Sequence, residues 1–130
     1  MRAILPCAIF AVLFGSAASA SDPALGKWRT EPDRKGQVGI VNVHECAEQK
    51  LCGRIVAARD PGGDPVVTPN VGKMVFWDMR PTEPGHYEGM AWVPARDAVY
   101  RAGMRLMGNR LKVRGCLGPI CQSQVWTRVK

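Results

Sequence analysis

Apolar and polar residues alternate along much of this chain with the period of two that is typical of β-strands. The clearest alternation lies between Val99 and Leu106, where Tyr100, Ala102, Met104 and Leu106 share one face. Arginines occupy much of the other face of this segment. One face is therefore predicted to be buried and the other to meet solvent.

Similar runs recur between turn-forming residues, and no helix-length amphipathic stretch competes with them. Besides 99–106 and a first strand near Trp28, the strand-like segments are 37–45, 52–58, 73–79, 86–93, 111–116 and 121–129. Prolines and glycines separate them, with Gly108-Asn109 suited to a tight hairpin turn. The pattern predicts an all-β fold of about eight antiparallel strands, at a spacing typical of small barrels.

The first twenty residues have the pattern of a cleaved signal peptide. Arg2 precedes an apolar run from Ala3 to Phe14, and small residues follow up to Ala20. Cleavage after Ala20 fits the small-x-small rule, so we expect a mature chain of one domain, residues 21–130. Cys7 lies inside the apolar run and not at the cleavage point, which argues against a lipid anchor. The expected location is periplasmic or secreted, without a transmembrane segment.

The mature chain retains four cysteines, and an oxidising compartment favours two disulfides. Three pairings are possible in principle. Spacing favours Cys46 with Cys52 and Cys116 with Cys121, because each pair encloses a short loop and can close across a hairpin. In the chain-entropy account, each closure stabilises the fold by about 2 kcal/mol. A zinc site is the rival interpretation, but the spacings do not match the usual ligand pattern.

The net charge of the chain is positive but does not by itself indicate a binding site. Loss of Arg2 leaves 17 Lys and Arg against 11 Asp and Glu, a formal charge of +6. The cations are spread along the chain and alternate with apolar residues, which favours the solvated face of a sheet over a dedicated anion patch. An anionic envelope partner, such as lipopolysaccharide, peptidoglycan or a protein, is the alternative, and no motif points to nucleic acid.

Three segments carry a resemblance to a known family. They are Gly26-Lys27-Trp28, Leu51 to Val56 with Cys52 inside it, and Gly115 to Arg128 with the second cysteine pair. Together they resemble the secreted bacterial family called domain of unknown function 2147, over essentially the whole mature chain. Where that family tends to have a compact glycine-containing turn, this chain reads Pro94-Ala95-Arg96-Asp97-Ala98.

The resemblance implies a small up-and-down β-barrel similar to the lipocalins, and it implies far less about function. It also implies a structural pair at the closed end of the barrel, with Arg128 stacked on the indole of Trp28. A guanidinium over an indole contributes roughly 0.5 to 2 kcal/mol.

Catalysis has little support in the sequence. The only histidines are His44 and His86, and neither lies in a nucleophile or metal-helix motif. His86 and Glu88 share a strand face, but such a pair is more often a surface pair than an acid/base couple. We therefore expect a protein that is not an enzyme, with no catalytic residue, no metal and no cofactor.

Methionine and aromatic residues gather in the central strands. They are Met74, Met79, Met90, Met104 and Met107 together with Phe76, Trp77, Tyr87, Trp92 and Tyr100. Plain core packing, an apolar ligand cavity and a cuprous site are the three interpretations, and the methionine spacing does not fit copper. For a cavity, the predicted ligand-binding residues are Tyr100, Met104 and either Trp77 or Trp92.

The favoured function is a non-catalytic, lipocalin-like module that binds a small apolar or amphipathic molecule inside the barrel. The alternative is an envelope protein-interaction module or hydrolase inhibitor, whose working surfaces would be the loops 61–69 and 94–97. A filled barrel interior would count against the first function, and a stoichiometric protein partner would favour the alternative.

Overall fold

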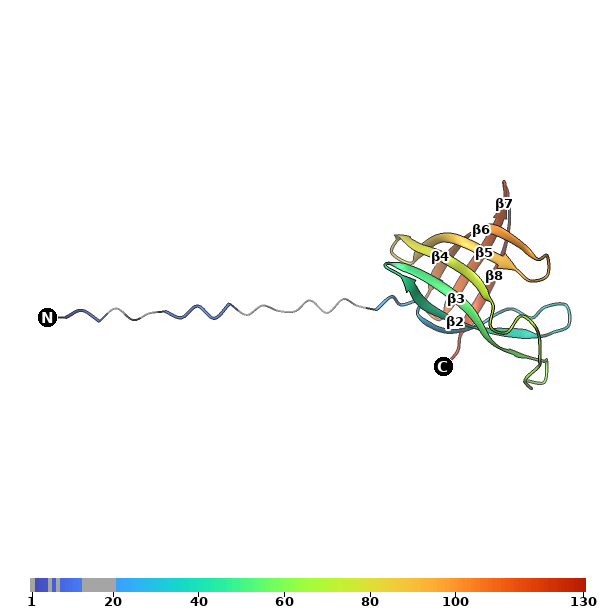
Figure 1. The fold of residues 1–130 in the computed structure, drawn as a ribbon, viewed down its shortest axis with the longest axis horizontal. Helices are drawn as coiled ribbons and strands as arrows, with labels where there is room; N and C mark the ends of the chain where they lie inside the picture. Colours follow the sequence, from blue (N-terminus) through green and yellow to red (C-terminus); the bar gives the residue numbers. More distant parts are fainter. Residues whose placement is uncertain (1, 5, 7, 13–20) are drawn as a thin grey trace.

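The chain forms a closed antiparallel barrel in which eight strands follow one another in sequence order. Figure 1 shows this barrel as a computed structural model. The structure describes residues 2–4, 6, 8–12 and 21–130. The strands are β1 (Gly26–Arg29), β2 (Val38–Ala47), β3 (Lys50–Arg59), β4 (Met74–Glu83), β5 (His86–Val93), β6 (Ala98–Met107), β7 (Arg110–Leu117) and β8 (Ile120–Arg128). The predicted all-β fold, the barrel and the number of strands are confirmed.

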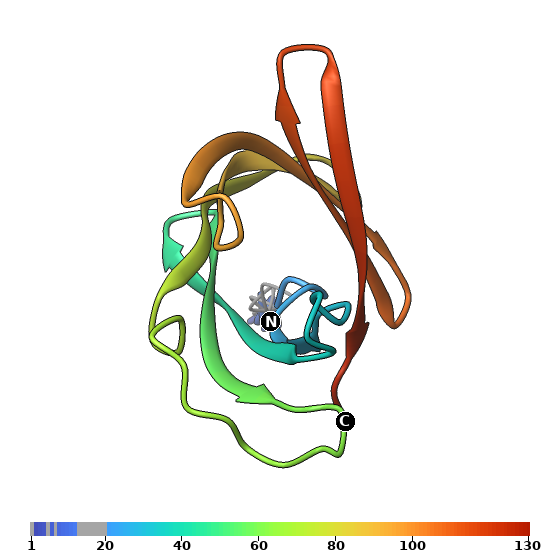
Figure 2. The same ribbon diagram turned by 90° about the vertical axis from the view of Figure 1, so that its right-hand side faces the viewer.

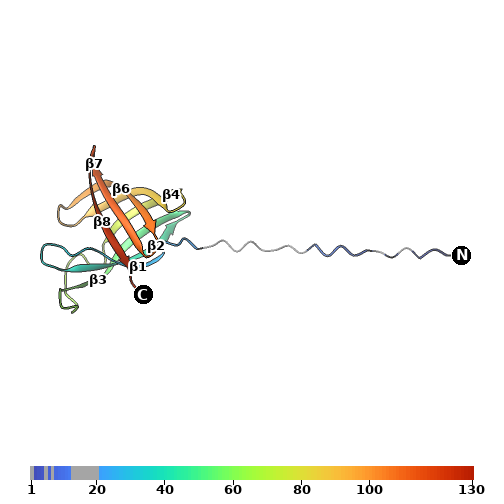
Figure 3. The ribbon, with the colours of Figure 1, turned by 180° about the vertical axis from the view of Figure 1, so that it is seen from behind.

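The seams between neighbouring strands differ in length. β7 and β8 pair over eight residue positions, from Arg110 opposite Thr127 to Leu117 opposite Ile120. β1 and β8, which close the barrel, pair only at Trp28 with Arg128 and at Arg29 with Thr127. Figure 3 shows short β1 beside the far end of β8. Most of β8 therefore has a strand partner on one side only.

The barrel interior is one apolar cluster drawn from every strand. Its largest fully buried side chains are Trp28, Phe76, Met79, Met104, Leu111 and Val41. Phe76 and Trp126 lie with their ring centroids 6.2 Å apart. The Phe76 ring lies so close to Gly53 that a Cβ at this position would overlap it, which explains the glycine. Large side chains thus meet across the barrel and fill much of its inside.

The segment before β1 covers one end of the barrel, which we call the closed end. The indole of Trp28 donates a hydrogen bond to the carbonyl oxygen of Ala24 at 2.9 Å. Arg128 lies over the Trp28 ring, with its Cζ 4.3 Å from the ring centroid. Its guanidinium donates to the carbonyl oxygens of Leu25, at 3.0 Å, and Pro23. A cation–π contact and three hydrogen bonds to one short segment hold this end shut.

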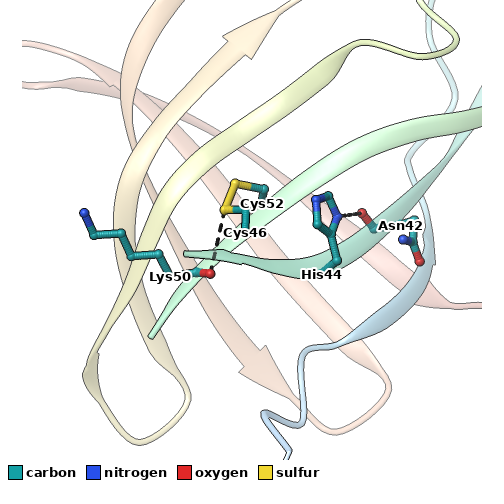
Figure 4. Close-up of a disulfide and its surroundings, with 5 residues drawn as sticks. All are labelled: Asn42, His44, Cys46, Lys50 and Cys52. Atoms are coloured by element: carbon teal, nitrogen blue, oxygen red, sulfur yellow. Dashed lines mark hydrogen bonds between the residues drawn. A yellow bond between two sulfur atoms is a disulfide. The ribbon is translucent and has the colours of Figure 1, made fainter. Parts of the chain in front are cut away.

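Both predicted disulfides are present. Cys46 bonds Cys52 across the β2–β3 hairpin, and Cys116 bonds Cys121 across the β7–β8 hairpin. Figure 4 shows the first of them on the same side of the sheet as His44. Disulfides of this kind form in oxidising environments, which is consistent with an exported protein.

The predicted signal peptide is described only in part. Residues 13–20, which lead up to the predicted cleavage after Ala20, fall outside the described residues, as does Cys7. The residues described between 2 and 12 form neither helix nor strand. Across the described part of the chain, no helix is long and apolar enough to cross a membrane.

Candidate functional site

Two of the four predicted ligand-binding residues point into the barrel. Met104 is buried, 1% exposed, and pairs with Tyr87 on one side and Val113 on the other. Tyr100 has the same orientation four residues earlier on β6, opposite Ala91, and is half-buried. Met104 is thus part of the packed core, whereas Tyr100 lies near the other end of the barrel, which we call the open end.

The two tryptophans lie on the outer face of the sheet, where both are partly buried and Trp92 packs against members of the core cluster. Trp77 pairs with Met90, and Trp92 pairs with Val99, next to inward pairs such as Phe76 with Ala91. Because neighbours on a strand point to opposite faces, both indoles face away from the interior. The Trp92 indole donates to the Asp97 carboxylate at 2.9 Å, and Lys73 lies 5.1 Å above its ring. The expectation that one of them lines the interior therefore does not match the strand registers, and the ligand-binding role of all four residues stays a prediction.

The histidines do not assemble a catalytic group. His86 lies opposite Arg105, and Glu88 lies opposite Arg80 on the other side, so each faces a cation. Nδ1 of His44 lies 3.4 Å from the backbone carbonyl oxygen of Asn42 (Figure 4). Among the described residues, no three His, Cys, Asp or Glu side chains cluster as metal ligands would.

Positive charge is concentrated on the outer face of β6 and β7. Strand alternation places Arg101 and Arg105 outward on β6, and it does the same for Arg110, Lys112 and Arg114 on β7. All five side chains are exposed. We call this surface the basic face.

No acidic residue offsets this face from its own strands. Residues 98–130 contain seven Lys or Arg and no Asp or Glu, whereas residues 21–97 contain ten Lys or Arg and eleven Asp or Glu. The net positive charge of residues 21–130 therefore comes from the part of the chain that forms β6, β7, β8 and the C-terminal residues after them.

A shallow hollow of about 430 Å³ lies at one edge of the basic face. Its outward side chains are Arg80, Glu88, Met90, Arg101 and Arg114, with Cys116 at one side. A Cβ at Gly103 would lie 2.8 Å from Arg114 Cζ, so the guanidinium lies directly over this glycine. Another hollow lies at the closed end, between Asp22 and Pro84. Neither hollow is enclosed by the barrel.

The β7–β8 hairpin extends away from the rest of the barrel, as the end-on view in Figure 2 shows. Its tip carries two exposed apolar residues, Leu117 at 68% and Ile120 at 71% exposure. The Cys116–Cys121 disulfide joins the two strands directly behind this tip. The hairpin is thus a braced projection with an exposed apolar tip.

The basic face is not apparent from the order of charges along the chain, because an uncharged residue follows each of its cations. The signal that finds it is the absence of acids after Asp97 combined with the period-two alternation of β6 and β7. The projecting hairpin depends on how far β6 and β1 extend beside β7 and β8. That is a property of register, which the sequence does not specify.

The match to known proteins coincides with this barrel. The family described as an uncharacterised protein conserved in bacteria, DUF2147, matches residues 26–128. The chain belongs to the DUF2147 family. The matched residues run from the first residue of β1 to the last residue of β8, so the DUF2147 unit corresponds to the eight-stranded barrel. Comparison with curated proteins and with solved structures found no match.

Proposed function

We propose that this barrel is a non-catalytic interaction module of the cell envelope that binds an acidic partner protein through its basic face. The observation that carries the proposal is the uneven charge, with five outward cations and no acid on β6 and β7. Such a surface attracts anionic groups and raises their local concentration. Four of the five cations are arginines, whose planar guanidinium suits carboxylates better than a lysine ammonium does.

The arrangement of the interior supports use of the outer surface. Large side chains such as Trp28, Phe76 and Met104 are fully buried in the middle of the barrel, whereas the hollow beside the basic face lies on its outer surface. A rigid barrel braced by two disulfides also presents its surface at little cost in conformational entropy. No arrangement of nucleophile, base and acid among the residues described here supports an enzyme, and the proposal involves no cofactor.

Binding of poly-L-glutamate tests the basic face directly. The triple variant Arg105→Gln, Lys112→Gln, Arg114→Gln should bind it about tenfold more weakly, because three exposed ion pairs contribute roughly 0.5 kcal/mol each. Affinity should also fall as salt is raised. Isothermal titration calorimetry measures both effects.

The matched control also removes three positive charges, but away from β6 and β7. Arg34→Gln, Lys35→Gln, Arg96→Gln changes exposed cations on two loops. It should leave affinity within about threefold of the unchanged protein, since screening confines each charge to about 10 Å. Equal losses in the two triple variants would mean that net charge alone drives binding, and the proposal of a dedicated face would fail.

A small apolar ligand at the open end is the second candidate. Tyr100 is half-buried there, and its inward neighbours Ala91 and Gly115 are small. A Cβ added to Gly115 would lie 3.7 Å from the Cβ of Tyr100. Small residues around an aromatic ring leave room for part of a ligand. Native mass spectrometry of protein isolated from its own host tests this. A bound mass lost in Tyr100→Ala supports the candidate, and a protein that carries no added mass contradicts it.

A further inference from the structure

The second edge of β8 is open over most of its length. β8 has nine residues, but β1 pairs only with Thr127 and Arg128 at its far end. Residues 120–124 are all exposed. An exposed strand edge presents unpaired N–H and C=O groups, which is the template for adding another strand.

The hydrogen bonds of β8 show which backbone groups face this open edge. The N–H of Val129 donates to the carbonyl oxygen of Lys27, on the β1 side. The N–H of Arg128 donates instead to the carbonyl oxygen of Asn109, in the turn just before β7. The backbone N–H and C=O groups of odd-numbered β8 residues therefore point toward the β1 side, and those of even-numbered residues point toward β7. By the same period of two, the N–H groups of Cys121 and Ser123 point toward the open edge.

The Cys116–Cys121 disulfide agrees with this assignment. Its Cα atoms are 4.0 Å apart, which suits the close approach of a pair that is not hydrogen-bonded within the ladder. The N–H of Cys121 is therefore not directed at β7.

One carboxylate of the chain already bonds this edge. The N–H of Val125 also faces the β1 side, but the chain turns away after Arg29, and Thr30 pairs with Gly39 instead. The side chain of Glu31 takes the place of a strand and accepts from Val125 at 3.3 Å. The next two donors along the edge, on Ser123 and Cys121, have no comparable partner among the described residues.

Charge selects the kind of segment that fits beside β8. Arg110, Lys112 and Arg114 on β7 lie opposite Thr127, Val125 and Ser123, whose short side chains leave the cations open toward the edge. A second copy of this chain would bring its own β6–β8 cations against these, which disfavours pairing of two barrels. An acidic segment meets the opposite charge.

We propose that an extended acidic segment of a partner protein adds to the sheet as a strand along residues 120–125 of β8, antiparallel or parallel to it. The proposal rests on the proposed function, since the basic face supplies the attraction, and it adds the backbone contact that orients the partner. Peptide amides would donate to and accept from Cys121 and Ser123, and acidic side chains on the outer face would meet the β7 cations.

Two synthetic peptides test the backbone contact on the intact protein. One alternates glutamate with threonine, and its twin has the same sequence with every backbone nitrogen methylated, which keeps the charge but blocks strand pairing. The unmethylated peptide should bind at least tenfold more tightly. Hydrogen exchange should slow at the amides of Cys121 and Ser123, as followed by NMR, with little change at Gln122 and Gln124.

A pair of variants locates the contact on β8. Ser123→Pro removes a donor that the barrel itself does not use, so the ladder to β7 keeps its bonds. It should weaken the unmethylated peptide at least tenfold, whereas Ser123→Ala should leave affinity unchanged. Thermal melting shows whether each variant is folded, and the methylated twin gives an independent answer if Ser123→Pro is not.

The outcomes separate this inference from the proposed function. Equal binding of both peptides, with no slowing of exchange at Cys121 and Ser123, overturns strand addition and leaves the basic face as the binding surface. The same holds if poly-L-glutamate binds and neither peptide does. If none of the three binds, the proposed function fails as well. A dimer in analytical ultracentrifugation that Ser123→Pro dissociates would show that the occupant is a second copy and would also overturn the inference.

Discussion

The closed end and the β7–β8 hairpin are built on opposite physical principles. At the closed end, apolar burial and satisfied polar groups act together: Trp28 is fully buried, its N–H is bonded, and Arg128 covers its ring. At the hairpin tip, Leu117 and Ile120 are exposed, and a disulfide brings the strands together where no core is available. The comparison teaches that the contacts that stabilise the fold and the apolar groups left open to solvent lie in different parts of one small barrel.

The largest expected effect comes from the same substitution made in both regions. Leu111 and Leu117 both lie on the inward side of β7, but Leu111 is 0% exposed and Leu117 is 68% exposed. Leu111→Ala should lower the free energy of unfolding by about 2–5 kcal/mol, because it leaves a cavity in the core. Leu117→Ala should change it by less than about 0.5 kcal/mol. Urea unfolding followed by tryptophan fluorescence measures both, and similar losses would mean that the tip packs against something.

Removal of the hairpin disulfide has the next largest effect. Cys116→Ala with Cys121→Ala should lower the free energy of unfolding by about 2 kcal/mol, because the unfolded chain regains the freedom that the short loop denied it. Hydrogen exchange should speed up between 116 and 121 more than at Met104 in the core. A reducing agent should reproduce the loss of order at the tip in the unchanged protein and have no such effect in the double variant. Uniform acceleration over the whole barrel would show that the hairpin is not a separate region.

Sequence reasoning predicts the barrel well and the surface less well. Alternation from Tyr100 to Leu106 identifies the inward face of β6, and cysteine spacing identifies both disulfides, since each depends on residues close together in the chain. The faces of Trp77 and Trp92 depend on the β4–β5 register, which an irregularity between Trp77 and Arg80 interrupts. Asp78 at that irregularity has a positive φ of 54°, which nothing in the local pattern signals.

The open β8 edge is harder still to predict, because it arises from what is missing beside it. It exists because β1 has four residues and the chain then turns at Thr30, whose hydroxyl accepts from the N–H of Gly39. A strand pattern in sequence gives the length of β8 but not the length of its neighbour in space. Pairing between the first and last strands joins residues about a hundred positions apart, which local periodicity does not register.

A smaller effect tests how the closed end depends on pH. Tyr87 is 3% exposed, and its hydroxyl donates to the Asp22 carboxylate at 2.6 Å. Burial first, and then the hydrogen bond and the charge of Asp22, raise the pKa of Tyr87 well above the ordinary 10.0. Above pH 10 the unfolded chain releases this proton while the barrel retains it, so stability that is complete below pH 10 falls as pH rises.

Tyr87→Phe should therefore lower stability by about 1 kcal/mol at neutral pH and flatten its decline above pH 10. Tyr100→Phe, at the open end, serves as the comparison and should leave the alkaline decline in place. Thermal melting between pH 7 and pH 11 gives both quantities. An unchanged alkaline slope in Tyr87→Phe would mean that another group causes the decline.

The smallest effect lies where the seam of the barrel passes into the open edge. Glu31→Ala removes the carboxylate that accepts from the N–H of Val125, and an exposed contact of this kind contributes only a few tenths of a kcal/mol. Global stability should hardly change, but the Val125 amide should exchange faster while Thr127, which is paired with Arg29, keeps its rate. Glu48→Ala, on the exposed β2–β3 turn, makes the same change of charge and should alter neither amide. If Val125 exchanges no faster in Glu31→Ala than in Glu48→Ala, the carboxylate does not protect this edge, and the open edge of β8 extends one N–H donor, two residues, closer to the seam.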